Sequence, residues 1–557
     1  MSLAEAVKPH LLWETELEQF EKFGALSSAA PGWSVTTKPL EGDDPPIGRG
    51  KLWAVYEKAF DYLEAETRPP PPTNYRYRKN TNHGSPDWNN SNDSLVWHIK
   101  RGIDIRKDGM SLQDAAAEHE RWFPGLGDLS FAATMFSRTG PNRKPITEWN
   151  VTSGRAIDTT EFYYCRRRAV FGLPTWINVV LRPMAIKMKS IIYGVHAHFH
   201  TTPERIAWKS GSLTMMSDDI SGFDLSVSYW HQEILAKWYS KFSSPYLARC
   251  YEELITLPII APPIGGMKST RAGDKLIVNA FHTAELLPTK GITKSGSVLT
   301  TIDGTVINFA RCLYAASRAW SACSHLDFKK GIDYVISKLR SSDLELYIQG
   351  DDVLWAGDGL DDFDHDAYVQ ASADFGFKCA LSPDPIFLMQ VVDRKNKRSY
   401  GLLSRFLQNT MFRERPKFDP IIERLSLATR VEKTLGFPGI RPVLNDLFNP
   451  LFRDKFGITW QQLVMDLKSG LLISQASKKD AGGFMDWLLG MARGDIEALD
   501  TTELGMLLGT SGIGQTALEN FINNQTITSS SELVRRAEDI NVPLDNNIVS
   551  EVWERRS

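Results

Sequence analysis

Residues 344–357, with the sequence LELYIQGDDVLWAG, form the strongest local pattern in the chain. Two runs rich in branched and aromatic residues, which favour strands, flank a Gly-Asp-Asp tripeptide, which favours a turn. The pattern predicts a β-hairpin with Asp351 and Asp352 at its tip. Adjacent acids on a buried hairpin are costly unless a cation binds there, and Mg²⁺ prefers carboxylate oxygens. A solvated turn is the alternative, because Gly and Asp are common turn residues.

Composition does not reveal the function, but it argues against an overall basic surface, a zinc site and a membrane-spanning segment. The 557 residues are 42% hydrophobic and 24% charged, which is typical of a globular protein with several subdomains. The net charge of −3 gives no overall basic surface, so any nucleic-acid surface has to be a local channel. Five scattered cysteines without C-x-x-C spacing indicate reduced thiols, no zinc site and an intracellular setting. The N-terminus lacks a signal-peptide pattern and no apolar run reaches membrane-spanning length, so we expect a soluble protein that does not enter the membrane.

A second group of acids follows a short apolar strand at residues 213–216. Residues 225–242 then show helical periodicity, so the acids lie at a strand-to-helix junction. Asp219 and Asp224 are five residues apart, which lets one stand at the strand end while the other reaches back from the first helical turn. Helix capping is the alternative for either acid.

Two further segments carry groups suited to a nucleotide. Three arginines, residues 166–168, precede a strand-like run, and guanidinium groups bind phosphates bidentately. A solvated strand edge would also explain them. Residues 262–297 read as loops over a strand pair, and Ser295 and Gly296 enter a predicted helix at residues 298–320. Thr300 and Asn308 share one side of that helix, and a plain core helix capped by Ser295 does not explain Asn308 among apolar neighbours.

The remaining pattern is mainly helical. A tyrosine- and arginine-rich stretch at residues 74–84 has a composition suited to base stacking, although a solvated linker is favoured. We expect helices at residues 11–23, 51–67 and 362–375, strands near 375–379 and 387–392, and mostly helix from residue 417.

Carboxylates from two strands can hold two Mg²⁺ ions, one activating a 3′ hydroxyl and one neutralising a leaving pyrophosphate. In this hypothesis Asp219 and Asp351 are bridging ligands, Asp352 lies beside them, and the arginines hold the triphosphate. The chemistry would be nucleotidyl transfer.

The segments SDDISGFD, SGSVLTTIDGTVIN and YIQGDD resemble motifs A, B and C of viral RNA-dependent RNA polymerases. The likeness is strongest to those of double-stranded RNA viruses of the picobirnavirus and partitivirus kind. RRRAVFG resembles motif F and FGFKCA resembles motif D, so the motifs span residues 166–378. Asn308 lies thirteen residues after Ser295, as in this branch, whereas many positive-strand relatives have the asparagine at the place of Gly304.

The resemblance implies a role for each motif residue. Asp219, Asp351 and Asp352 would bind two Mg²⁺ ions, for which Mn²⁺ can substitute, and a one-residue slip would make Asp218 the ligand. The five-residue spacing to Asp224 favours Asp219. The other implied roles are recognition of the ribose 2′-OH by Asp224, Ser295, Thr300 and Asn308, binding of the triphosphate by Arg166 and Arg168, and protonation of pyrophosphate by Lys378.

The implied fold is α+β, a closed right hand whose palm has an antiparallel sheet with flanking helices and whose thumb is helical. The expected domains are an N-terminal helical extension bridging fingers and thumb (1–80), fingers (81–205 and 243–293), palm (206–242 and 294–412), and thumb with the C-terminal segment (413–557).

The implied function is transcription and replication of a viral RNA genome, with primer-independent initiation. The C-terminal tail or a loop between residues 387 and 398 could act as a platform for unprimed starts, and a simple surface segment is the alternative. Template and product RNA, nucleoside triphosphates and a viral capsid protein are the expected partners of a monomer in the virion interior and host cytoplasm. A reverse transcriptase is one alternative, although it would be expected to carry a bulky aromatic at position 224. An inactive palm-fold RNA-binding virion protein is the other, and the intact acids argue against it.

Overall fold

The computed structural model describes thirteen parts of the chain. They are residues 40–65, 92–122, 131–139, 150–151, 155–156, 167–192, 199, 201–261, 285–402, 420–437, 440–469, 471–472 and 475. The helix expected at 11–23, the tyrosine- and arginine-rich stretch, Arg166, Cys165 and the C-terminal tail lie outside these residues.

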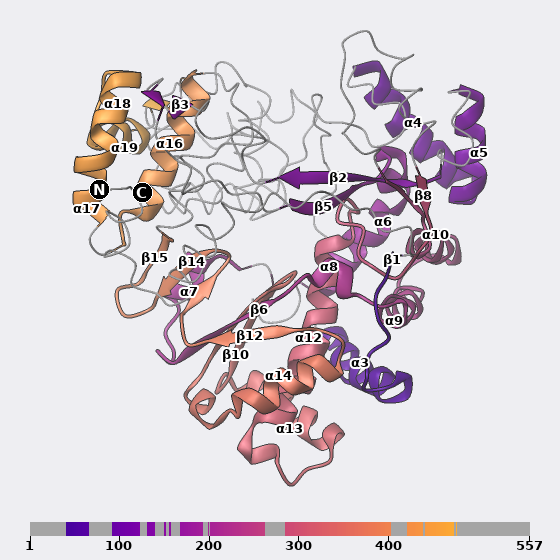
Figure 1. Ribbon diagram of the computed structural model, residues 1–557. Helices are drawn as coiled ribbons and strands as arrows, with labels where there is room; N and C mark the ends of the chain where they lie inside the picture. The colour runs from indigo at the N-terminus through magenta and orange to yellow at the C-terminus, as the bar shows by residue number, and fades with distance from the viewer. Residues whose placement is uncertain are drawn as a thin grey trace, which may run out of the picture.

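A four-stranded antiparallel sheet forms the centre of the molecule (Figure 1). Its strands lie in the order β10 (Glu345–Gln349), β11 (Asp352–Ala356), β6 (Met215–Ile220) and β12 (Cys379–Ser382). The expected hairpin is confirmed: Gln349 pairs with Asp352, so the turn has only two residues. Gly350 has a φ of 64°, which is the left-handed conformation that a two-residue hairpin turn with glycine first requires.

One long helix, α12 (Thr300–Ala319), packs beneath the sheet and is buried on nearly all sides. Its neighbours are α3 (Arg49–Glu64), α13 (Phe328–Ser341) and α14 (His365–Asp374), which surround it below the sheet in Figure 1. The helices expected at residues 51–67, 298–320 and 362–375 are therefore confirmed. A helix that is apolar on most faces is stable only inside a protein, which is where α12 lies.

The helix expected at residues 225–242 is wrong in one respect, because the chain forms two helices there. These are α8 (Phe223–Ser226) and α9 (Tyr229–Tyr239), and the two residues between them are extended, with ψ of 113° at Val227 and 163° at Ser228. The Val227 carbonyl accepts a hydrogen bond of 2.7 Å from the amide of Ile292. The helical pattern is interrupted because this backbone binds a distant loop.

The strand expected at residues 387–392 is also two strands. The segment folds into β13 (Ile386–Phe387) and β14 (Gln390–Asp393), and β15 (Arg398–Gly401) completes a small antiparallel sheet. Leu388 and Met389 form the first turn with φ of 49° and 60°, a conformation unusual for bulky residues. The segment in which an initiation platform was expected is therefore a pair of tight hairpins.

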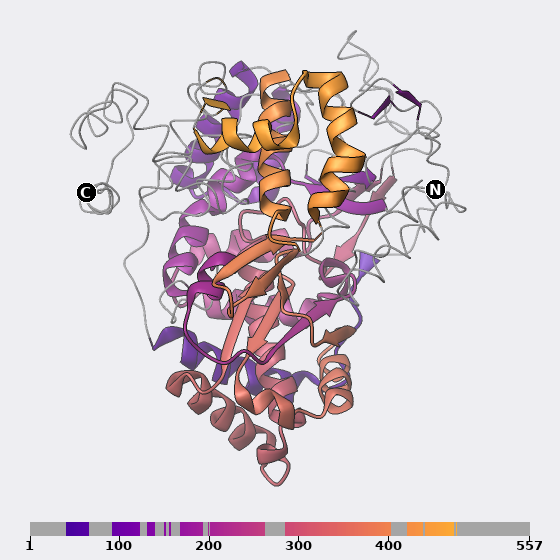
Figure 2. The ribbon, with the colours of Figure 1, turned by 90° about the vertical axis from the view of Figure 1, so that its left-hand side faces the viewer.

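Two further groups of elements flank the central sheet. The C-terminal group lies above β13–β15 in Figure 2 and is mostly helical, as expected from residue 417 on. The other lies on the opposite side in Figure 1 and combines helices with the sheet β5-β2-β7-β8. The first contains α16 (Pro420–Thr434), α17 (Ile440–Val443), a π-helical turn (Leu444–Phe448), α18 (Asn449–Phe456) and α19 (Trp460–Lys468). The second contains α4 (Asn92–Asp108), α5 (Leu112–Trp122), β2 (Ala133–Thr139), β5 (Arg167–Gly172), α6 (Thr175–Ile192), α10 (Pro245–Ile255), β7 (Ile259–Ala261) and β8 (Glu285–Leu287).

Three smaller elements complete the described chain. A short helix, α7 (Pro203–Trp208), packs against β14 and β15. Strand β1 (Leu40–Glu41) pairs with β9 (Thr289–Lys290), and β3 (Asn150–Val151) pairs with β4 (Arg155–Ala156). Among the described residues, no helix is both long and apolar enough to cross a membrane. The four described cysteines are free thiols, and Cys250, Cys312 and Cys323 are buried.

An aromatic stack joins α3 to α9. The rings of Phe60 and Trp238 lie 4.3 Å apart at an angle of 6°, and both side chains are buried. The indole nitrogen of Trp238 also donates a hydrogen bond of 2.6 Å to Glu64. Segments almost 180 residues apart in the chain are thereby held in one core.

We expect Phe60→Ala to lower the free energy of unfolding by about 3–5 kcal/mol, because it leaves a cavity in this core. Urea denaturation of the purified protein measures the change. Lys51→Ala, at an exposed position of the same helix, is the matched control and should change the free energy by less than about 0.5 kcal/mol. Equal effects of the two substitutions would contradict the prediction.

Candidate active site

Strand register brings two of the predicted acids together at one end of the central sheet. Val353 of β11 pairs with Asp218 of β6, so one step further along both strands Asp352 lies beside Asp219. Side chains directly opposite each other in antiparallel strands have Cβ atoms about 4.5–5.5 Å apart and point to the same face. Two like charges in this arrangement repel each other, and a bound cation would relieve the repulsion.

Asp351 occupies the turn next to this pair. Its side chain is exposed, as is that of Asp219, whereas Asp352 is half-buried. Among the described residues, no group of three or more acids, histidines or cysteines is arranged to hold a metal ion. The donor set nevertheless suits Mg²⁺, since three carboxylates from adjacent positions supply the oxygens that this ion takes. The sequence predicts Asp351 as the bridging ligand with Asp352 beside it, whereas the register puts Asp352 directly beside Asp219.

Asp218 points to the opposite face of the sheet from Asp219. Its side chain is fully buried and accepts hydrogen bonds from Arg311 Nη2 at 2.5 Å and from the Tyr368 hydroxyl at 2.8 Å. Successive residues of a strand alternate between faces, so Asp218 and Asp219 cannot both face the same site. This arrangement favours Asp219 over Asp218 as the predicted ligand.

The hairpin turn rests on α12. The amide of Gly350 donates to Thr305 Oγ1 at 3.0 Å, and the side-chain nitrogen of Asn308 donates to the Gly350 carbonyl at 2.9 Å. A Cβ at Gly304 would lie 3.3 Å from Gly350 Cα, closer than most such contacts. Both backbone groups of the turn glycine are therefore held by one helix. Asn308 is fully buried beneath the turn, and its expected contact with a ribose stays a prediction.

Ser295 and Thr300 lie in and after a loop, residues 291–299, that contacts several elements. Ser295 Oγ accepts a hydrogen bond of 3.0 Å from the amide of Phe171 in β5, and Thr300 Oγ1 donates to the Lys294 carbonyl at 2.9 Å. The carbonyl of Asp224 accepts from the amide of Thr293 at 2.8 Å. The structure thus brings together the segments that carry three predicted ribose contacts.

Sequence reasoning missed one residue that fixes this loop. Asn178 of α6 donates to the Gly296 carbonyl at 3.0 Å and accepts from the amide of Val298 at 3.0 Å. A Cβ at Gly296 would lie 2.3 Å from the Phe171 carbonyl oxygen, so only glycine fits between loop and strand. The available signal was a polar residue within the apolar run TWINVV, the same signal that drew attention to Asn308.

The predicted phosphate-binding residues are placed less completely. The backbone of Arg168 lies in β5, opposite Arg138 of β2, and Arg166 lies outside the described residues. Lys378 is exposed just before β12, and its carbonyl accepts a hydrogen bond of 2.9 Å from the amide of Ser221. Lys378 therefore lies at the same end of the sheet as Asp219.

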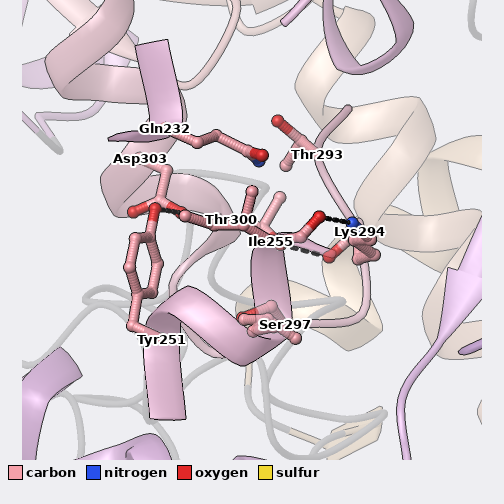
Figure 3. Close-up of a pocket in the computed structure, with 9 residues that line it drawn as sticks. Gln232, Tyr251, Ile255, Thr293, Lys294, Ser297, Thr300 and Asp303 are labelled. Atoms are coloured by element: carbon pink, nitrogen blue, oxygen red, sulfur yellow. Dashed lines mark hydrogen bonds between the residues drawn. The ribbon is translucent and has the colours of Figure 1, made fainter. Parts of the chain in front are cut away.

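A small cavity of about 10 Å³, enough for about one water molecule, lies behind the loop (Figure 3). Lys294 Nζ donates to the carbonyl of Ile255 at 2.5 Å, and burial lowers the pKa of Lys294 to about 7. Asp303 accepts hydrogen bonds from the hydroxyls of Tyr239 at 2.5 Å and Tyr251 at 3.0 Å. Burial raises the pKa of Asp303 to about 7, although these two bonds lower it in part.

Comparison with known proteins supports the fold. No protein-family model and no curated protein matches the sequence. Among solved structures, the RNA-dependent RNA polymerase of bacteriophage phi12 matches with a TM-score of 0.54 at 16% identity, covering 80% of this chain and 74% of that one. The chain has the fold of an RNA-dependent RNA polymerase. An insertion-loop deletion mutant of a human picobirnavirus RNA-dependent RNA polymerase aligns with a TM-score of 0.43 at 12% identity, covering 86% of this chain and 84% of that chain.

The RNA-dependent RNA polymerase fold agrees with the mixed α and β class and the antiparallel sheet expected from the sequence. In this chain the acids of β6 and of the β10–β11 turn meet at one end of the central sheet.

We expect Asp303→Asn to remove a pH dependence of stability. In the unfolded chain this carboxyl has an ordinary pKa of about 3.9, whereas in the folded protein burial raises the pKa to about 7. The folded state therefore binds the proton more tightly, and the stabilising contribution is complete below about pH 4 and is lost as the pH rises to about 7. The variant keeps an acceptor for one tyrosine, and its amide nitrogen can donate to the hydroxyl oxygen of the other. Because the amide does not titrate, the stability of the variant relative to the wild type should rise as the pH rises across this range.

Urea denaturation at pH 5 and at pH 8 measures the difference in free energy of unfolding between the variant and the wild type. From pH 5 to pH 8 this difference should shift in favour of the variant by about 1.4 kcal/mol for each pH unit between pH 5 and the folded-state pKa of about 7. Asp61→Asn, at an exposed position, is the control and should show no such change. A difference between Asp303→Asn and wild type that is the same at both pH values would contradict the assignment.

Proposed function

We propose that this protein is an RNA-dependent RNA polymerase that joins ribonucleoside triphosphates on an RNA template. The observation that carries the proposal is the position of Asp219 beside Asp352, next to Asp351, at the end of the sheet in a polymerase fold. Asp219, Asp351 and Asp352 would hold two Mg²⁺ ions, with Mn²⁺ able to substitute. When bound, such ions supply an activated 3′ hydroxyl and neutralise charge on the leaving pyrophosphate.

The protein groups around this site would bind and orient the nucleotide. Arg166 and Arg168 would contact the triphosphate, because guanidinium groups pair bidentately with phosphate oxygens. The bond between Ser295 and the amide of Phe171 supports this role, since it ties the arginine strand β5 to the loop that would contact the ribose. Lys378, at the same end of the sheet, would donate a proton to the pyrophosphate.

Recognition of the ribose 2′-OH would involve Asp224, Ser295, Thr300 and Asn308. The first three belong to segments in direct contact through the hydrogen bond between Thr293 and Asp224 and that between Thr300 and Lys294. Asn308 is bonded to Gly350 instead, so a contact with ribose would require it to exchange that partner.

The wider setting of the activity also belongs to the proposal. The chain would form a closed right hand with the domain boundaries given above, start RNA synthesis without a primer, and act as a monomer beside a viral capsid protein in the virion interior and host cytoplasm. Strand β15, the last strand of the two hairpins, packs against α16 of the C-terminal group.

We expect Asp351→Asn and Asp219→Asn each to abolish RNA synthesis, because a neutral amide binds Mg²⁺ far more weakly than a carboxylate. The assay contains purified protein, single-stranded RNA without primer, labelled ribonucleotides and Mg²⁺ or Mn²⁺. Asp361→Asn, which neutralises an exposed acid on the short helical turn after β11, is the matched control and should leave synthesis unchanged. The folded state of each variant is checked by circular dichroism and urea denaturation.

Near-normal synthesis by folded Asp351→Asn would show that the acid site is assigned wrongly. A wild type that binds RNA but incorporates nothing, with or without a primer, would favour the inactive virion protein.

We expect the wild type to prefer ribonucleotides strongly over deoxyribonucleotides and Asp224→Ala to narrow this preference. A site that hydrogen-bonds a hydroxyl rejects the substrate that lacks it, because its own polar groups are then left unpaired. Competing incorporation of each ribonucleotide and its deoxy counterpart gives the ratio of kcat/KM values, with Asp361→Asn again as control. Equal use of both sugars by the wild type would indicate a different polymerase class.

A further inference from the structure

One fully buried guanidinium connects the two halves of the acid site. Arg311 of α12 has no exposed surface, and its three kinds of nitrogen each contact a different element. Nε donates to Asn308 Oδ1 at 2.8 Å, Nη1 to Ser372 Oγ at 2.8 Å, and Nη2 to Asp218 Oδ2 at 2.5 Å. The planar fork of arginine fixes these directions relative to one another.

The first contact reaches the hairpin turn. An amide side chain can place either its oxygen or its nitrogen toward a neighbour, but arginine has only donors to offer. Arg311 therefore requires the oxygen of Asn308 on its own side, which directs the amide nitrogen to the Gly350 carbonyl, 2.9 Å away. Arg311 in this way fixes the orientation of the amide that holds the turn next to Asp351.

The contact of Nη2 with Asp218 reaches the strand that carries Asp219. Asp218, the preceding residue, accepts hydrogen bonds from both Arg311 and Tyr368, and Tyr368 in turn accepts one of 3.1 Å from the indole of Trp355. Burial lowers the pKa of Arg311, but Asp218, Cys312, Tyr368 and Cys379 together raise it well above the ordinary value. The position of β6 is thus coupled to α12 through the hydrogen bond between Arg311 and Asp218.

We propose that Arg311 is a positioning residue for the acid site, because it sets the turn bearing Asp351 in relation to the strand bearing Asp219. The inference rests on the proposed function, since it concerns the separation of carboxylates that would hold Mg²⁺. Arg311 itself contacts neither substrate nor metal, as it lies under the sheet on the face opposite Asp219. Groups that orient metal ligands typically change metal affinity or activity about 10–100-fold when replaced.

A role in stability alone makes a different prediction. A buried ion pair is weak evidence for net stability, and breaking one of its partners is destabilising wherever the pair lies. The chain offers a matched comparison in Arg394, which is also buried and donates to Glu345 at 2.5 Å, to the Ser212 carbonyl at 2.9 Å and to the Ile206 carbonyl at 3.2 Å. Glu345 lies at the end of β10 away from the turn, so Arg394 holds the same sheet at the end without the acid site.

The test compares Arg311→Lys with Arg394→Lys in the full chain. Lysine keeps the charge but cannot reproduce the fork, so each variant should lose stability in urea. Arg311→Lys alone should raise the Mg²⁺ concentration for half-maximal RNA synthesis about 10–100-fold. Binding of Mn²⁺, followed without substrate by electron paramagnetic resonance, should weaken by a similar factor.

Asp218→Asn is a second variant in case Arg311→Lys does not fold, because it keeps the side-chain volume and one acceptor while removing the charge from the bond. It should weaken Mn²⁺ binding in the same direction. If Arg311→Lys or Asp218→Asn binds Mn²⁺ as well as Arg394→Lys does, the positioning role is overturned while the proposed function stands. A wild type that neither synthesises RNA nor binds Mn²⁺ contradicts the proposed function, and the inference with it.

Discussion

Repulsion between neighbouring carboxylates is the physical constraint on which the site depends. Asp219 and Asp352 lie side by side because of the register of β6 and β11, and Asp351 follows in the turn. Such an arrangement lowers stability unless the strands are held firmly from elsewhere and a cation occupies the site. The firm support comes from α12, which binds both backbone groups of Gly350. The apolar packing around α12 offsets the loss of stability caused by repulsion between the acids.

The loop before α12 links this support to the neighbouring sheet. Ser295 binds the backbone of β5, Asn178 binds the loop from α6, and the backbone of Val227 and Asp224 binds it from the other side. Each of these bonds joins segments far apart in sequence, so the loop has one position only when all of its neighbours are in place. A nucleotide that shifted the loop would therefore also displace the strand carrying the arginines and the helix carrying Asp224.

Local patterns predicted the elements but not the contacts between them. The hairpin, α12, α14 and α3 could be predicted because turn chemistry and periodicity are local. The spacing to Asp224 favours Asp219 over Asp218, but the faces that the two acids occupy follow only from the register, since a one-residue slip exchanges the two faces of a strand. The break at Val227 and Ser228 depends on a loop more than sixty residues later, which no periodicity reveals. Arg311 gave no signal at all, because an arginine within an amphipathic helix is usually exposed.

The close approach of α12 to the turn has a consequence for how such a sequence can change over time. A Cβ at Gly304 would lie 3.3 Å from Gly350 Cα. A side chain there would act as a wedge that lifts the turn by a few tenths of an ångström. Under the proposed function, selection for the geometry of the acid site would then keep position 304 small, whereas exposed positions on α13 and α14 are free to drift. Whether a position tolerates substitution therefore depends on whether it supports the turn, and such positions extend well below the acid site.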